Sequence, residues 1–249
     1  MNRIEKTYGF GFPRDLARFY AIARKHRDAL FEAGVRFAGP LALLDGWKLE
    51  ADLGRWASDP PELFTVAEGD SDGLHWGWVL HDPGRDPGHV AWFYAREGYP
   101  IESTAPTLTH AIHGHVRAMR EQREEELAEV RDVGEDDAEL ARGIARMKKL
   151  EDALRKAIGK PNRFTAKKEA APTLDGLGVR APKSALAKLD AKKLAKDLRA
   201  RKVGAWLERG HELIAEGKAG SALVIARDAL AALPTKELIY ERELLICRM

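Results

Sequence analysis

Apolar and polar residues alternate between positions 63 and 95 with the two-residue period of β-strands. We expect strands over residues 63–68, 74–81 and 90–95, with a further short strand beginning at Ile101. The alternation is clearest in the second run, whose apolar set is Leu74, Trp76, Trp78 and Leu80. The connections are short and rich in turn-forming residues, which predicts an antiparallel meander. In this meander the two tryptophans face the core and His75 lies on the opposite face.

Helical spacing dominates on either side of these strands. Residues 13–33 place their apolar side chains on one stripe and predict a single helix. A short apolar element follows at residues 41–44. Beyond the strands, a long and mostly charged helix is expected over residues 107–131, capped by Thr107. A second charged helix is expected over residues 136–158.

The C-terminal third of the chain begins with Pro- and Gly-containing residues 162–182, which predict an extended connector. Residues 183–202 carry eight Lys or Arg residues and predict a basic helix. Two or three further helices are expected over residues 203–249. Small and apolar residues there have the spacing of one tetratricopeptide unit: Trp206, Gly210, Leu213, Ala222, Ala226, Ala229 and Pro234. This pattern predicts a helical hairpin that turns at residues 217–220, with Arg209 in place of the usual leucine.

Charge and aromatic content divide the chain into unequal parts. Residues 1–115 carry 12 Lys or Arg against 16 Asp or Glu, whereas residues 116–249 carry 29 against 23. Five of the six tryptophans lie in the first part. We therefore expect an aromatic-rich α+β domain over residues 1–115 and a helical domain over 183–249, joined by charged helices and a connector over 116–182.

Several classes of protein are excluded by what the sequence lacks. No apolar run approaches the ~18 residues that a membrane span needs, and no secretory signal is visible. A single cysteine, Cys247, excludes an intramolecular disulfide framework. No nucleotide-binding loop or nucleophile motif occurs, so we expect no cofactor and no enzymatic activity of its own. A cytoplasmic protein without a membrane partner is expected.

The candidate metal ligands and nucleic-acid contacts are weak on sequence grounds. His110 and His113 share a helical face with His115 close by, but no further ligand completes a set, so no metal is expected. His75 and His81 stand too far apart along a strand to share a metal. The basic helix carries no aromatic residue on which a base could stack, so we expect a solvated face and no nucleic-acid partner.

Several runs of residues along the chain are specific enough to be compared with known protein families. The most specific run lies between Asp59 and Pro83 and contains Asp59-Pro-Pro-Glu-Leu-Phe-Thr-Val66 and Leu74-His-Trp-Gly77. Other matching runs are Pro13-Arg-Asp-Leu16, Gly39-Pro40, Leu43-Leu-Asp-Gly46 and Thr173-Leu-Asp-Gly-Leu-Gly-Val179. Together these runs resemble one protein family, the histone PARylation factors and their bacterial relatives, over roughly residues 13–249.

The resemblance implies a non-enzymatic accessory factor for an ADP-ribosyltransferase. A member of this family lends a carboxylate to the active site of its partner, where it acts as general base on an acceptor serine. The alignment places Glu216 at this position and Gly220 at a glycine of the family. Ala215 and Ala219 stand where the family has an aspartate and a tyrosine.

The N-terminal part of the family is in turn similar to the SUKH superfamily, whose bacterial members include immunity proteins. The fold implied is α+β, with a SUKH-like antiparallel sheet and helices followed by an all-helical C-terminal domain. It also implies a second candidate function, an immunity protein that binds and neutralises a toxin. The partner expected is therefore a protein, either an ADP-ribosyltransferase or a toxin.

Overall fold

The fold was analysed in a computed structural model, which describes residues 2–9, 11–47, 56, 59–81, 89–95, 101, 103–158 and 171–247. Contacts between residues divide the chain into two compact units. The first unit comprises Met1–Arg55, Glu62–Phe93 and Ser103–Phe164. The second comprises Trp56–Pro61, Tyr94–Glu102 and Thr165–Met249. The three-part division expected from composition stays a prediction.

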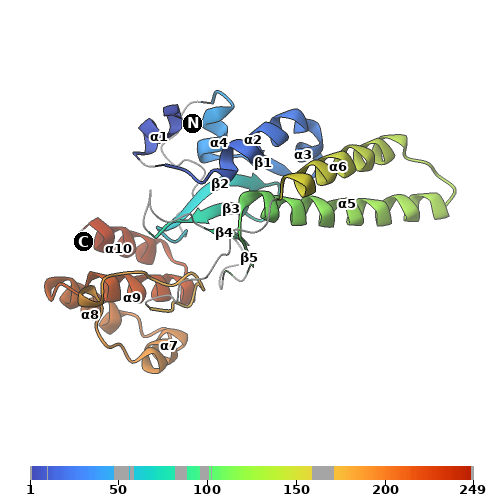
Figure 1. The fold of residues 1–249 in the computed structure, drawn as a ribbon. Coiled ribbons are helices and arrows are strands. Elements are labelled where there is room, and N and C mark those ends of the chain that lie inside the picture. The colour runs from blue at the N-terminus through green and yellow to red at the C-terminus, as the bar shows by residue number, and fades with distance from the viewer. Residues whose placement is uncertain are drawn as a thin grey trace. The chain divides into compact units, whose positions relative to one another are not determined.

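The first unit is built on a five-stranded sheet with the strands in sequence order (Figure 1). The strands are β1 (Val35–Phe37), β2 (Leu63–Gly69), β3 (Leu74–Val79), β4 (His89–Tyr94) and β5 (Ser103–Ala105). β2 and β3 pair antiparallel with Leu63 opposite Val79, and one register shift lies between Thr65 and Ala67. The antiparallel meander and the α+β fold class are thus confirmed, whereas β1 was not predicted because three residues show no period.

β3 is buried along its whole length. Trp76 packs edge-on against His115 of the helix that follows the sheet, with 4.8 Å between ring centroids, and Trp78 lies 5.7 Å from Phe12. His75 is also fully buried and meets Phe93 of β4 at 4.5 Å. Both tryptophans therefore belong to the core, as predicted, and the strand has no solvent-facing side.

Four short helices precede β2 or flank β1: α1 (Asn2–Tyr8), α2 (Asp15–Lys25), α3 (Arg27–Glu32) and α4 (Gly39–Leu44). The prediction of one helix over residues 13–33 is wrong, because the backbone of His26 leaves the helical region with φ −118° and ψ 36°. The apolar stripe continues through this break, with Leu16, Phe19 and Leu30 all buried. The stripe therefore could not reveal the break.

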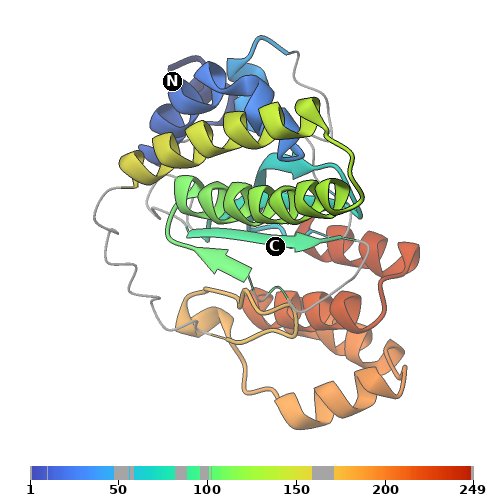
Figure 2. The same cartoon turned by 90° about the vertical axis from the view of Figure 1, so that its right-hand side faces the viewer.

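Two long helices, α5 (Leu108–Asp132) and α6 (Ala138–Ala157), run side by side and extend beyond the sheet (Figure 1). Thr107 caps α5 as predicted, since its side chain accepts the N–H of His110. Asp137 caps α6 by accepting the N–H groups of Glu139 and Leu140. α5 packs on the sheet, and α6 lies between α5 and the pair α2 and α3 (Figure 2).

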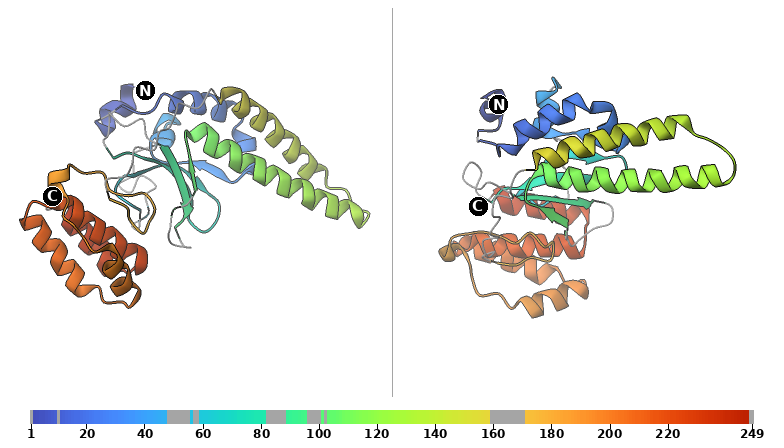
Figure 3. Two further views of the ribbon diagram at one scale, coloured as in Figure 1. Left: turned by 60° about the horizontal axis from the view of Figure 1, so that its bottom comes forward. Right: turned by 45° about the vertical axis from the view of Figure 1, so that its right-hand side comes forward.

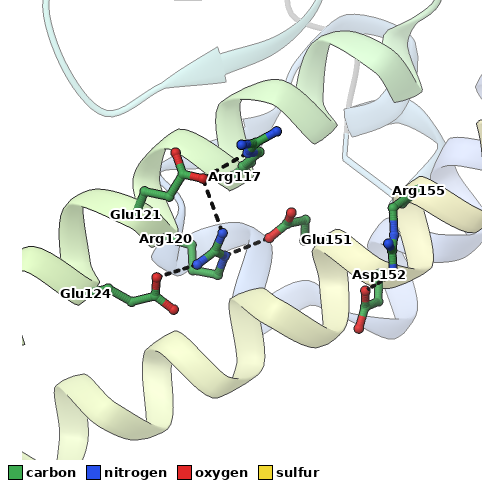
Figure 4. Close-up of polar contacts among 7 residues, drawn as sticks. All are labelled: Arg117, Arg120, Glu121, Glu124, Glu151, Asp152 and Arg155. Atoms are coloured by element: carbon green, nitrogen blue, oxygen red, sulfur yellow. Dashed lines mark hydrogen bonds and ion pairs between the residues drawn. The ribbon is translucent and has the colours of Figure 1, made fainter.

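Ion pairs lie along the surfaces of α5 and α6, and one of them joins the two helices. Arg120 donates from Nε to Glu151 of α6 at 2.7 Å and from Nη1 to Glu124 of its own helix at 2.5 Å (Figure 4). Each of the other arginines of the two helices also pairs with a carboxylate; they are Arg117, Arg123, Arg131, Arg142, Arg146 and Arg155. The arginines of the two predicted charged helices are therefore all paired with carboxylates at the surface.

The second unit contains a 3-10 turn at Lys183–Ala185 and the helices α7 (Ala191–Arg199), α8 (Gly204–Ala215), α9 (Ala219–Ala232) and α10 (Lys236–Cys247). α8 and α9 form an antiparallel hairpin, as the small-residue pattern predicts, and α7 and α10 also pack on α9 (Figure 3). The core contains Leu194, Leu198, Leu213, Ala222, Ile225, Ala229 and Leu230.

The predicted basic helix over residues 183–202 is shorter than expected. Leu186 is extended, and α7 begins only after Asp190, whose side chain accepts the N–H of Lys193. In the described part of the predicted connector, residues 171–182, an antiparallel bridge joins Ala171 and Val179. The chain therefore turns back on itself there and does not run extended as predicted, while residues 162–170 lie outside the described residues.

Candidate functional site

Glu216, the predicted carboxylate donor, lies at the C-terminal end of α8, where the hairpin turns toward α9. Gly217 follows in the left-handed region with φ 73°, where a glycine is favoured. The N–H of Gly217 donates to the carbonyl of Ile214 at 2.9 Å, and that of Lys218 donates to Leu213 at 2.7 Å. This closing motif fixes the backbone that carries Glu216.

An ion pair holds the Glu216 side chain on the surface of α8. Arg209 donates to its two carboxylate oxygens at 2.7 and 3.2 Å, and also to Glu212 at 2.8 Å. The Glu216 side chain remains 48% exposed. The hydrogen bonds from Arg209 lower the pKa of the Glu216 carboxyl, and the charge of Lys218 adds to this effect. Arg209, the departure from the tetratricopeptide leucine, thus keeps this carboxylate ionised at a helix terminus that disfavours negative charge.

The segment before α7 braces the turn from the other side. Lys218 donates from Nζ to the carbonyl of Ser184 at 2.6 Å. The hydroxyl of Ser221 accepts the N–H of Ala187 at 2.7 Å. Gly220 lies so close to Ala181 that an added Cβ would come within 2.6 Å of it. The exposed carboxylate therefore stands on a turn with little freedom to move.

A buried arginine, Arg227 of α9, holds the Thr173–Val179 segment in place. Its Nε and Nη2 donate to the two oxygens of Asp175 at 2.7 and 2.6 Å, and Nη1 donates to the carbonyl of Gly178 at 2.6 Å. Arg227 and Asp175 are each only 2% exposed. This charge-paired contact joins two parts of the sequence more than fifty positions apart.

The neighbouring Asp228 is a second buried carboxyl group. It accepts the N–H of Leu174 at 2.6 Å and is 7% exposed. Burial raises the pKa of Asp228 to about 6, and the nearby Asp175 charge adds to the rise. A buried Asp228 carboxyl group with this pKa changes its protonation state near pH 6.

Arg242 of α10 makes a similar contact with the Asp59–Pro60 segment. It is 2% exposed, and its Nη1 donates to the carbonyl of Asp59 at 2.6 Å. Sequence reasoning missed both arginines as structural residues. One signal was available for Arg227, because Arg227 and Asp228 are charged residues inside the otherwise apolar helix α9.

The histidines of α5 serve separate contacts. His110 lies 2.8 Å from the hydroxyl of its cap Thr107, and His115 lies 2.8 Å from the carbonyl of Ala33. Burial lowers the pKa of His115. Among the described residues, no three side chains of His, Cys, Asp or Glu gather as metal ligands would. Asp82, which directly follows His81 in the sequence, lies outside the described residues.

No helix in the described ranges combines the length and the apolar character needed to cross a membrane. A comparison with curated proteins gives no match. A family model described as histone PARylation factor 1 matches residues 1–196, which are most of the 249 in the chain. The match includes the Asp59 and Thr173–Val179 segments and stops within α7, before Glu216. The chain therefore belongs to the histone PARylation factor 1 family.

Proposed function

We propose that this protein is a non-enzymatic accessory factor that binds an ADP-ribosyltransferase and directs modification to serine. The observation that carries the proposal is the family match over residues 1–196. It contains both segments that the buried arginines hold, so the second unit is organised around family residues. The transferase supplies the reaction, and this chain supplies a surface and one side chain.

The side chain that we propose for this role is Glu216. A general base on a serine hydroxyl has to be ionised, exposed and rigidly supported. The ion pair with Arg209 supports the first requirement and the hairpin turn supports the third. In the joint site, one carboxylate oxygen would accept the hydroxyl proton as the serine oxygen attacks the anomeric ribose carbon of NAD+ held by the transferase, and the bond from that carbon to nicotinamide would break to release nicotinamide. The carboxylate has to leave Arg209 for that step, since a paired oxygen is a weaker proton acceptor.

The test combines the protein with an ADP-ribosyltransferase encoded in the same genome and maps acceptor residues by mass spectrometry. The Glu216→Gln variant should bind the transferase as tightly as the unaltered chain and lose serine modification. Glu212→Gln is the matched control, because Glu212 pairs with the same Arg209 one turn earlier and is not at the hairpin turn. It should keep serine modification.

Two outcomes would contradict the proposal at different levels. Serine modification that survives Glu216→Gln would leave Glu216 as a turn residue and keep the accessory role. Failure to bind any transferase from that genome would remove the accessory role itself. The toxin-binding alternative stays a prediction, to be tested by the same binding assay with secreted toxins.

A further inference from the structure

The cations at and after α7 differ from all the arginines of α5 and α6 in lacking a carboxylate partner. They are Lys192, Lys193, Lys196, Arg199, Arg201 and Lys202, and all are exposed. Within the described part of the chain, none of them forms a side-chain ion pair or hydrogen bond. The helix dipole accounts for basic residues in the last turn of α7, but not for the cations beyond it.

Both acidic residues of this segment are occupied by neutral donors. Asp190 accepts the N–H of Lys193 as the cap of α7. Asp197 accepts the indole N–H of Trp206 at 3.1 Å. Neither carboxylate forms an ion pair in the described part of the chain, and residues 190–202 carry six Lys or Arg against these two Asp, so the surface remains positive overall.

Arg201 occupies a backbone position that favours glycine. Its φ is 59°, and its N–H and that of Lys202 donate to Leu198 and Asp197, each at 2.9 Å. α5 and α8 end in the same hydrogen-bonding motif, with Gly134 and Gly217 at this position. An arginine at the glycine position of a helix end is strained, and such strain at one residue points to a function for its side chain.

A cavity of about 520 Å³ lies beside Arg201 in the second unit. Arg199 and Arg201 line it together with apolar residues: Leu174, Leu198, Ala231, Ala232 and Leu233. Leu174 is 37% exposed although it is a large apolar side chain. The cavity thus offers an apolar surface beside two guanidinium groups that have no carboxylate partner among the described residues.

We propose that this surface, formed by the cations of residues 192–202 and the cavity at Arg199 and Arg201, docks an acidic peptide segment of a partner protein. An apolar side chain of the peptide would enter the cavity while flanking Asp or Glu carboxylates pair with the arginines. The inference rests on charge complementarity and the cavity, and it does not depend on Glu216.

A peptide fits these features better than a nucleic acid does. Nucleic-acid surfaces combine cations with aromatic side chains on which bases stack. The described residues that line the cavity include no aromatic side chain, and Trp206 is partly buried with its indole N–H on Asp197. An aliphatic cavity with arginines at its side instead matches an aliphatic side chain with acidic neighbours.

A peptide display library selected on the full chain tests the proposal. Enriched peptides should carry several Asp or Glu residues around one large apolar residue. The Arg199→Gln/Arg201→Gly double variant should weaken the best synthetic peptide at least about tenfold. Its melting temperature should not fall, because glycine suits the φ of residue 201. Lys148→Gln/Lys149→Gln on exposed lysines of α6 removes the same charge and should leave the affinity within about twofold.

Three results would overturn the proposal. The first is enrichment without acidic residues, or equal binding by the double variant. The second is a single-stranded 12-nucleotide DNA that binds more tightly than the peptide through the same two arginines. The third is concentration-dependent self-association of the chain that the double variant abolishes, which would assign the surface to a second copy.

Discussion

The arginines of α5 and α6 share one role, whereas those of the second unit have several. On α5 and α6 every arginine is paired with a carboxylate at the surface, and most of these pairs lie within one helix. In the second unit Arg227 and Arg242 are buried against family segments, and Arg209 pairs with carboxylates at the surface. Arg199 and Arg201 are exposed and have no carboxylate partner among the described residues. Arginine side chains therefore form surface ion pairs on α5 and α6. In the second unit, some are buried and hold distant segments together, and others are exposed and available to bind a partner.

This difference predicts where substitutions matter. An exposed ion pair contributes little, because water already solvates both charges and the side chains lose freedom. A buried pair is costly to break, because the remaining charge has no partner. Stability should thus depend on the arginines of α9 and α10 rather than on the conspicuous network of α5 and α6.

The largest effect is expected at Arg227. Arg227→Met leaves the Asp175 carboxylate buried without its partner, which should cost about 3–5 kcal/mol of unfolding free energy. Chemical denaturation of the full chain measures this loss. Adding Asp175→Leu should recover part of it, because the uncompensated charge is then gone. A loss below about 1 kcal/mol for Arg227→Met alone would contradict a structural role for the buried Arg227–Asp175 ion pair.

A substitution in the apolar core should cost a similar amount of unfolding free energy through lost packing instead of lost charge pairing. Trp78→Ala empties a buried site between β3 and Phe12 and should cost about 3–5 kcal/mol. If this variant melts at the temperature of the unaltered chain, the placement of β3 in the core is wrong. If both Trp78→Ala and Arg227→Met destabilise, each unit has its own core.

Asp228 should give a smaller effect that depends on pH. Its folded pKa of about 6 exceeds the unmodified value of 3.8, so the folded state binds the proton more tightly. The stabilisation is present below about pH 4 and is lost as pH rises through 6. Asp228→Asn should therefore match the unaltered chain near pH 4 and exceed its stability at pH 7, by about 2–3 kcal/mol. A constant difference across this range would contradict the buried carboxylate.

The smallest effects are expected on the surface of α5. Arg120→Ala, which removes the link to Glu151 of α6, should cost about 1 kcal/mol. Arg123→Ala removes only a pair with Glu126 on the same helix and should cost less than about 0.5 kcal/mol. Thermal melts of the two variants test this order, and an equal or reversed order would contradict the bridging role of Arg120.

The elements that follow a local rule could be predicted from the sequence. Thr107 marked the start of α5, and Gly217 marked the turn that carries Glu216. The break at His26 could not be predicted, because the apolar stripe runs through it without a Pro or Gly.

Contacts between residues far apart in the sequence were harder to predict. Nothing near Asp175 indicates that Arg227 will reach it, since the pairing depends on how α9 packs. Arg201 was likewise hidden, because a left-handed helix end is recognised in a sequence by glycine. The proposal of Glu216 as the carboxylate donor came from the family resemblance, and the structure shows that this residue lies at the turn between α8 and α9.

The most direct test of the accessory role is a titration of this protein into a transferase from the same genome, with acceptor residues mapped at each concentration. If the protein is an accessory factor, serine residues should become acceptors in proportion to the amount of complex formed. The protein alone should modify nothing. A set of acceptor residues that stays the same at saturating concentrations of the protein would contradict the accessory role.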